Sequence, residues 1–165
     1  MTPRGQARTL QPSVIDRLIA PSARGPSATG NSGSQSMREL KDSVRRDLEW
    51  LLNSRRTPED PPKSALELSR SVYCYGLPDI ASFSLGSADA KSELARRIET
   101  AVAMFEPRLR NVQVHLLPAV QGSRILRFQI EALLRTDPAP ARVCFDTSLE
   151  PLSGEYEIAG ESSAR

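Results

Sequence analysis

Glu106 and Arg108 are the two residues of this sequence whose types and spacing come closest to a catalytic pair. Glu106 is the best-placed carboxylate, but glycoside hydrolysis also needs a second carboxyl group across a substrate cleft. The guanidinium of Arg108 favours the charged form of a neighbouring carboxyl group and so opposes a general-acid role. The pair therefore gives little support to a cell-wall hydrolase, the enzyme class we weigh against other functions.

Histidine and cysteine give no further catalytic set. His115 is the only histidine, and it alternates with Val114 and Leu116, so we expect it to point to solvent. Cys74 and Cys144 each lie in an apolar or aromatic stretch, and we expect two buried free thiols. The sequence has no metal-ligand spacing, no glycine-rich phosphate loop and no G-x-S-x-G elbow. We therefore predict no enzymatic activity, no cofactor and no metal site.

Composition narrows the class of partner. The chain of 165 residues is long enough for one domain with tails. Its 22 basic and 20 acidic residues nearly balance, and only 5% of residues are aromatic, so neither charge nor stacking favours nucleic acid. The start lacks the apolar core of a secretory signal, and no apolar run approaches the roughly 20 residues that span a bilayer. We expect a soluble cytoplasmic protein without direct membrane insertion.

The Glu106–Arg108 pair lies at a predicted corner between a helix and a strand. Pro107 ends the helix because its ring disfavours the α conformation at the preceding residue. After the corner, Val112 and Val114 alternate with polar residues, as in a strand with one buried face. The helix before it is indicated by apolar residues at three- and four-residue steps, namely Leu94, Ile98, Ala101, Val102 and Phe105.

The residues before this corner predict two more helices. A capping box at Ser36 opens the first, and a second apolar periodicity predicts another over residues 64–75, which Gly76 ends. Ser87 or Asp89 caps the helix before the corner. The stripe of the first helix comprises Met37, Leu40, Val44, Leu48, Leu51 and Leu52, and the loop after Gly76 is expected to be anchored by Ile80, Phe83 and Leu85.

The residues after the corner predict an antiparallel sheet. Residues 124–135 alternate cleanly between apolar and polar side chains and form a hairpin with the preceding strand. Residues 142–146 supply a third strand, and residues 152–158 a shorter fourth one. Because helices come first and antiparallel strands last, we predict an α+β fold in which N-terminal helices pack on a C-terminal antiparallel β-sheet.

The chain divides into four parts. Residues 1–20 form an N-terminal docking segment, in which Val14, Ile15, Leu18 and Ile19 share one helical face. Residues 21–35 are a flexible tether rich in Ser, Gly and Pro, residues 36–158 are the α+β domain, and residues 159–165 are expected to fray. Two interpretations of the first segment remain open: it folds back onto its own domain, or it docks on another protein.

Four segments in order along the chain carry a family resemblance. They are LQPSVIDRL (residues 10–18), RDLEWLLNSR (46–55), SVYCYGLPD (71–79) and FEPRL (105–109). Together they resemble the TssE family, whose members are the baseplate subunits of the bacterial type VI secretion system. These subunits are similar to the baseplate wedge protein of contractile phage tails. The resemblance covers nearly the whole chain except the tether.

The resemblance implies a structural subunit on which the contractile sheath starts to polymerise, in a baseplate docked at the inner membrane. It implies other wedge subunits as partners and indirect association with the tail tube and spike hub complex. It also implies sheath subunits that bind by β-strand augmentation, for which the edges around residues 142–146 and 152–158 are candidates. A regulatory protein-binding module of the same fold, similar to a bacterial anti-adaptor, is the second functional interpretation.

The resemblance further implies that Glu106, Pro107 and Arg108 form an interaction motif. A corner fixed by proline presents a carboxylate and a guanidinium that have little conformational entropy left to lose on binding. Arginine can also bind a partner carboxylate in a bidentate manner. The alternative is that the charged pair forms an intramolecular cap or salt bridge.

Overall fold

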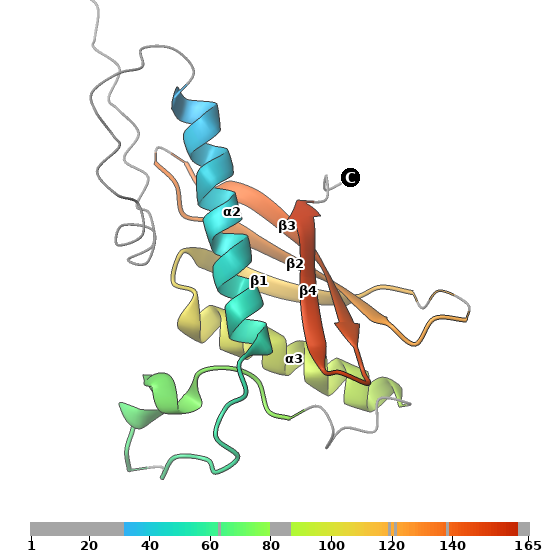
Figure 1. Cartoon of the computed structure of the whole chain (residues 1–165). Helices are drawn as coiled ribbons and strands as arrows, with labels where there is room; N and C mark the ends of the chain where they lie inside the picture. Colours follow the sequence, from blue (N-terminus) through green and yellow to red (C-terminus); the bar gives the residue numbers. More distant parts are fainter. Residues whose placement is uncertain are drawn as a thin grey trace, which may run out of the picture.

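In the part of the chain that the structure describes, two helices cover one face of a four-stranded antiparallel sheet (Figure 1). A computed structural model of the chain describes residues 32–62, 64–79, 87–118, 120, 122–137 and 139–161. The predicted α+β fold, with N-terminal helices packed on a C-terminal antiparallel sheet, is confirmed. The expected docking segment of residues 1–20 and the expected loop anchors Ile80, Phe83 and Leu85 lie outside the described residues.

Helix α2 (Ser32–Asn53) supplies one wall of the core. It begins before the expected start at Ser36, so the predicted capping box lies inside the helix and the helix overlaps the predicted tether of residues 21–35. In this extension Gly33 costs a helix about 1 kcal/mol, and serine and glutamine cost only tenths of a kcal/mol each, so a helix anchored by its buried stripe can extend through these residues. The predicted stripe faces the sheet, and its members Leu40, Val44, Leu48, Leu51 and Leu52 are buried.

Helix α3 (Ala88–Phe105) leads to the corner. Ser87 is its N-cap, because its Oγ accepts a hydrogen bond from the backbone N–H of Ala90 at 3.0 Å. Leu94, Ile98 and Val102 form the predicted stripe and are fully buried. The helix ends one residue before Glu106, as the position of Pro107 predicts.

The four strands form a meander in the order β1-β2-β3-β4. Helix α2 packs along β4 and helix α3 packs along β1 (Figure 1). Four alternate side chains of β2 that were predicted to share one face are buried against the helices, namely Phe128, Ile130, Ala132 and Leu134. The strands are β1 (Leu109–Leu116), β2 (Leu126–Leu134), β3 (Ala141–Glu150) and β4 (Glu155–Glu161).

Strand β1 contains a bulge directly after the corner. Its register against β2 shifts between Arg110 and Gln113, and Asn111 takes a left-handed conformation with φ of 51°. Asparagine tolerates this conformation better than most residues, and an extra residue in one strand increases the local twist. After the bulge Val114 is buried and His115 is exposed, so the prediction that the histidine points to solvent is confirmed.

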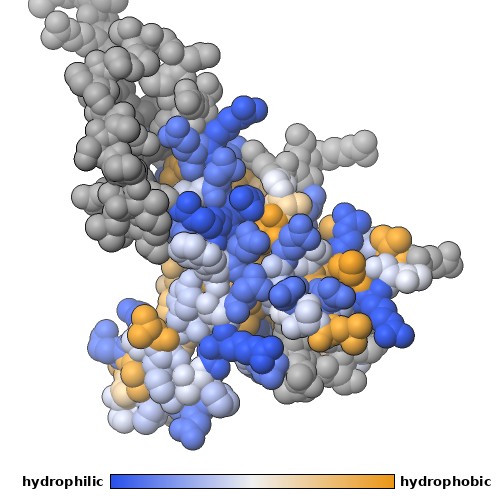
Figure 2. All heavy atoms as spheres, in the orientation of Figure 1, coloured by the Kyte–Doolittle hydropathy of each residue, from blue (hydrophilic) through white to orange (hydrophobic). Residues whose placement is uncertain are grey.

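The predicted helix over residues 64–75 is wrong. The structure has two short 3-10 turns there, Leu68–Arg70 and Val72–Cys74, separated by Ser71 in an extended conformation. The Oγ of Ser71 accepts a hydrogen bond from the backbone N–H of Tyr73 at 3.2 Å, so the serine starts a new turn instead of continuing a helix. Val72 is 89% exposed, so this apolar periodicity does not mark a buried face. Figure 2 shows hydrophobic side chains at the surface of this region, at the lower left.

Two further predictions concern the C-terminal part and the cysteines. Strand β4 runs to Glu161, which pairs with Phe145, so the ordered domain extends past the boundary expected at residue 158. This pairing across a register shift supplies the backbone partner that holds residues 159–161 in the sheet. Cys74 and Cys144 are free and buried, as predicted. Within the described part of the chain, neither helix has the length and hydropathy needed to cross a bilayer.

The chain returns from the 3-10 turns to the end of α2. Leu77 donates its backbone N–H to the carbonyl of Ser54 at 2.9 Å and accepts from the N–H of Arg56 at 3.0 Å. Gly76 permits this close approach: its φ is +102°, and a Cβ atom there would lie 2.2 Å from the carbonyl oxygen of Ser54. The segments 46–55 and 71–79 are therefore fastened to each other by backbone bonds.

Candidate functional site

The corner of Glu106, Pro107 and Arg108 joins the helical layer to the sheet. Glu106 donates its backbone N–H to Val102 at the end of α3, at 2.9 Å, and its carbonyl accepts from Leu109 at the start of β1, at 3.0 Å. The carbonyl of Arg108 accepts from the N–H of Arg135 at 2.8 Å, next to β2. Backbone hydrogen bonds thus connect Glu106 to both α3 and β1, and Arg108 to the residue that follows β2.

The carboxylate of Glu106 and the guanidinium of Arg108 form a bidentate ion pair. Arg108 Nε donates to Glu106 Oε1 at 2.7 Å, and Arg108 Nη2 donates to Oε2 at 2.5 Å. The backbone N–H of Arg108 also donates to Oε1, at 3.2 Å. Glu106 is only 5% exposed, so the pair satisfies a carboxylate that would otherwise be buried without a counter-charge.

Arg108 also connects the corner to α2. Its Nη1 donates to Ser43 Oγ at 3.1 Å, and its Nη2 donates to Asp47 Oδ2 at 2.5 Å. Burial opposes the charge of Arg108, but the hydrogen bonds and negative charges of Glu106 and Asp47 outweigh it and raise the pKa of the guanidinium. Burial, followed by the charges of Asp47 and Glu106, raises the pKa of Tyr75 as well, so its phenol stays neutral beside the two carboxylates.

The intramolecular salt bridge, which the sequence left as the alternative to partner binding, is present. A guanidinium has five N–H groups, and four hydrogen bonds from that of Arg108 go to Glu106, Ser43 and Asp47. Among the described residues, one N–H on Nη1 is therefore left without an acceptor. The Arg108 side chain is 18% exposed, whereas Pro107 lies at the surface. What the triplet offers to a partner is therefore the ring of Pro107 and one N–H of Arg108.

The sheet has two edge strands, and both meet polar side chains of the helices. Of the two candidate edges, the one at residues 142–146 is excluded, because β3 pairs with β2 on one side and with β4 on the other. The other predicted edge, at residues 152–158, is an edge strand for the part that belongs to β4. The order of the strands in the sheet, and not the composition of either segment, decides which of them lies at an edge.

Side chains of α2 and α3 bind the outward backbone groups of these edges. On β4, Asn53 bonds to both the N–H and the carbonyl of Tyr156, and Arg45 Nη1 donates to the carbonyl of Ile158 at 3.5 Å. On β1, Glu99 Oε1 accepts from the N–H of Val114 at 2.8 Å. The fold therefore closes parts of both edges with its own side chains.

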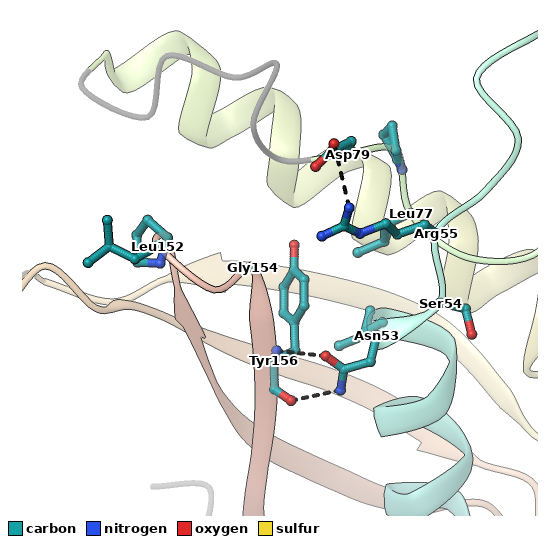
Figure 3. A pocket seen from close by; sticks show the side chains of 11 residues that line it. Asn53, Ser54, Arg55, Leu77, Asp79, Leu152, Gly154 and Tyr156 are labelled. Carbon is teal, nitrogen blue, oxygen red and sulfur yellow. Dashed lines mark hydrogen bonds and ion pairs between the residues drawn. The ribbon is translucent and has the colours of Figure 1, made fainter.

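A small pocket is the feature that sequence reasoning missed. It has a volume of about 80 Å³ and lies between the end of α2, residues 77–79 and the β3–β4 turn (Figure 3). Arg55 and Asp79 stand at its rim as an ion pair of 3.7 Å, and Tyr156 lies inside it. The only signal in the sequence was that Arg55 and Asp79 belong to two of the four segments with family resemblance.

The remaining predicted site residues do not converge with these features. Val14, Ile15, Leu18 and Ile19, the predicted docking face, lie outside the described residues. Within the described residues, His, Cys, Asp and Glu form no group of three that could hold a metal ion. His115, on the exposed side of β1, and the buried Cys74 and Cys144 belong neither to the corner nor to the pocket lining.

Comparison with known proteins identifies the family. Residues 38–139 match the family model described as baseplate wedge protein gp25, which is more than half of the chain and runs from α2 to the end of the β2–β3 connection. No curated protein matches the chain. The matched family is structural and non-enzymatic, in agreement with the prediction from the catalytic inventory, and it implies other baseplate components as partners. Because this match covers more than half of the chain, the chain belongs to the baseplate wedge protein gp25 family.

Proposed function

We propose that this protein is the TssE-type baseplate subunit of a type VI secretion system. In this role it joins wedge subunits and provides the platform from which the contractile sheath polymerises. The observation that carries the proposal is the family match over residues 38–139, combined with the four TssE-like segments in order along the chain. The protein then acts in the cytoplasm, in a baseplate docked at the inner membrane and in indirect contact with the tube and spike hub complex.

The corner of Glu106, Pro107 and Arg108 is the proposed docking point for other wedge subunits. The hydrogen bonds to Ser43 and Asp47 hold the guanidinium in place, so a partner that contacts it does not have to order it. The exposed ring of Pro107 adds a rigid apolar contact next to it. Internal pairing and partner binding are then compatible, because the hydrogen bonds of Arg108 inside the protein fix the orientation of the guanidinium that a partner contacts.

Two further contacts belong to the proposal. Sheath subunits add a strand to β4, the edge strand whose outward groups Asn53 and Arg45 now occupy. The apolar face of Val14, Ile15, Leu18 and Ile19 docks on a neighbouring subunit, and the tether of residues 21–35 keeps it at high effective concentration.

Sheath assembly in living cells tests the proposed function. Deletion of the gene from a cell that carries it should abolish sheath foci formed by a fluorescent sheath subunit, and the intact gene in trans should restore them. Normal sheath foci in the deletion strain would exclude the type VI role. Clearing of peptidoglycan by the purified protein would instead support the hydrolase interpretation.

Two variants separate docking from folding at the corner. Asp47→Ala and Arg108→Met both remove the bond between these residues, but only the second removes the cation of the corner. We expect both to lower stability and only Arg108→Met to abolish capture of purified wedge subunits at a temperature at which both variants are folded. If Arg108→Met captured the wedge subunits as well as Asp47→Ala does, the role of Arg108 would be purely internal.

A further inference from the structure

The pocket between α2 and the β3–β4 turn is lined by Tyr156, whose buried hydroxyl finds no acceptor among the described residues. Tyr156 is 3% exposed, and its hydroxyl has no hydrogen-bond partner in the part of the chain that the structure describes. Figure 3 shows the ring rising from β4 with the hydroxyl pointing to the side of the pocket where Arg55 and Asp79 stand. A buried hydroxyl without a hydrogen-bond partner lowers the stability of the fold. Its presence here is explained if a bound ligand supplies the missing acceptor.

Arg55 supplies a second donor at the same pocket. Its side chain is 71% exposed, and its ion pair with Asp79, at 3.7 Å, is too long for a hydrogen bond. Among the described residues this is the only interaction of the guanidinium, which also lies over the β3–β4 turn, 3.9 Å from the place of a Cβ on Gly154. The parallel bridge between Arg55 and Leu77 holds its backbone in place.

These donors fit an anion of small size and single charge. A hydroxyl and a guanidinium at two sides of one pocket can each bond to one oxygen of a carboxylate. A volume of about 80 Å³ admits the end of a side chain and excludes a nucleotide. The nearby carboxylate of Asp79 repels a dianion such as phosphate more strongly than a single negative charge. Burial raises the pKa of Tyr156, so the hydroxyl keeps its proton and remains a donor.

We propose that this pocket binds the carboxylate of a Glu or Asp side chain from a neighbouring protein. The rim favours a protein over a free acid, because Leu152 is 79% exposed beside the pocket and Pro78 and Pro151 also line it. These apolar surfaces can pack against the stem and neighbours of an acidic residue. The inference rests on the proposed function only in taking the carboxylate from another baseplate component.

A titration with two matched amino-acid derivatives tests the pocket. The isotope-labelled full-length protein is titrated with N-acetyl-glutamate α-methylamide, which has one side-chain carboxylate, and with its neutral glutamine analogue, at constant ionic strength. We expect the glutamate derivative to shift the resonances of Arg55 Nε–H and of the Gly154 and Tyr156 amides in a saturable manner, with a dissociation constant on the order of 10 mM. The glutamine analogue should bind at least about tenfold more weakly.

Three variants make the test specific. Tyr156→Phe and Arg55→Gln should each weaken binding of the glutamate derivative by about tenfold. Arg56→Gln is the control, because it removes the same charge from the adjacent residue, whose guanidinium pairs with Asp60 and does not line the pocket. The dispersion of the amide spectrum of each variant shows that it is folded.

Three results would overturn the inference: equal shifts with both derivatives, unchanged binding in both pocket variants, or no saturable shift up to roughly 100 mM. The titration uses no baseplate partner, so failure of the sheath experiment leaves its result untouched. Conversely, a failed titration leaves the type VI role as it stands.

Discussion

The side-chain amide of Asn53 pairs with the backbone of Tyr156 as a neighbouring strand would. Its Oδ1 accepts from the Tyr156 N–H at 2.9 Å, and its Nδ2 donates to the Tyr156 carbonyl at 2.8 Å. Because β4 is an edge strand, this contact occupies two backbone groups that another chain would otherwise bind. A strand that adds to β4 at this position must therefore first displace Asn53.

Asn53→Ala should open this part of the edge. Loss of the two bonds should lower the free energy of unfolding by about 2 kcal/mol and accelerate hydrogen exchange of the Tyr156 amide by at least about tenfold. Amide exchange by NMR and urea unfolding measure both effects. Ser54→Ala is the matched control, because among the described residues the Ser54 hydroxyl bonds to the carbonyl of Trp50 in α2 and not to β4. Unchanged exchange at Tyr156 would show that the amide does not protect the edge.

Arg108→Met should destabilise the domain, because it leaves the carboxylates of Glu106 and Asp47 without their shared cation. Breaking a largely buried pair from one side costs about 3 kcal/mol. In the double variant with Glu106→Gln the loss should be smaller than the sum of the two single losses, with a coupling of about 1–3 kcal/mol. Urea unfolding of the four proteins measures this coupling. Additive losses would contradict a direct pairing of the two side chains.

Local rules predicted the parts of the fold that depend on near neighbours in sequence. Pro107 sets the end of α3, and the apolar steps of α2 and alternation of β2 set which faces are buried. The prediction of a helix over residues 64–75 is wrong, because the Ser71 side chain bonds to the backbone N–H of Tyr73 and starts a new turn. Periodicity alone cannot distinguish a buried helical face from one that is left in solvent.

Contacts distant in sequence account for what was missed at the site. Arg108 and its partner Asp47 are 61 residues apart, so the sequence could place a cation at the corner without revealing where it points. Likewise, Arg55, Asp79 and Tyr156 come from three separate segments, and only the backbone bonds of Leu77 and the register of β4 bring them to one pocket.

Gly76→Ala should disrupt the connection between α2 and residues 75–79. A Cβ at this position would lie 2.2 Å from the carbonyl oxygen of Ser54, and the backbone φ of +102° is itself unfavourable for alanine. We expect a loss of about 3 kcal/mol from the conformational penalty and the clash together. Gly122→Ala is the control, with a φ of +81° and, among the described residues that do not adjoin it, no atom within 4 Å of the added Cβ; it should cost only the conformational penalty, about 1 kcal/mol. Thermal or urea unfolding compares them, and equal losses would show that the close approach to Ser54 is not important.

Tyr156 should make the stability of the protein fall in alkaline solution. Burial raises the pKa of its phenol in the folded state well above the ordinary value of 10.0. Its contribution is therefore fully present below about pH 10 and is lost as the pH rises toward the folded-state pKa, because only the unfolded chain releases the proton there. Between about pH 10 and pH 11 the native protein should lose about 1 kcal/mol more of its free energy of unfolding than Tyr156→Phe does. Urea unfolding of both proteins across this range measures the difference. Parallel pH profiles would show that the phenol reaches solvent in the folded state, and the carboxylate pocket would then lose its buried donor.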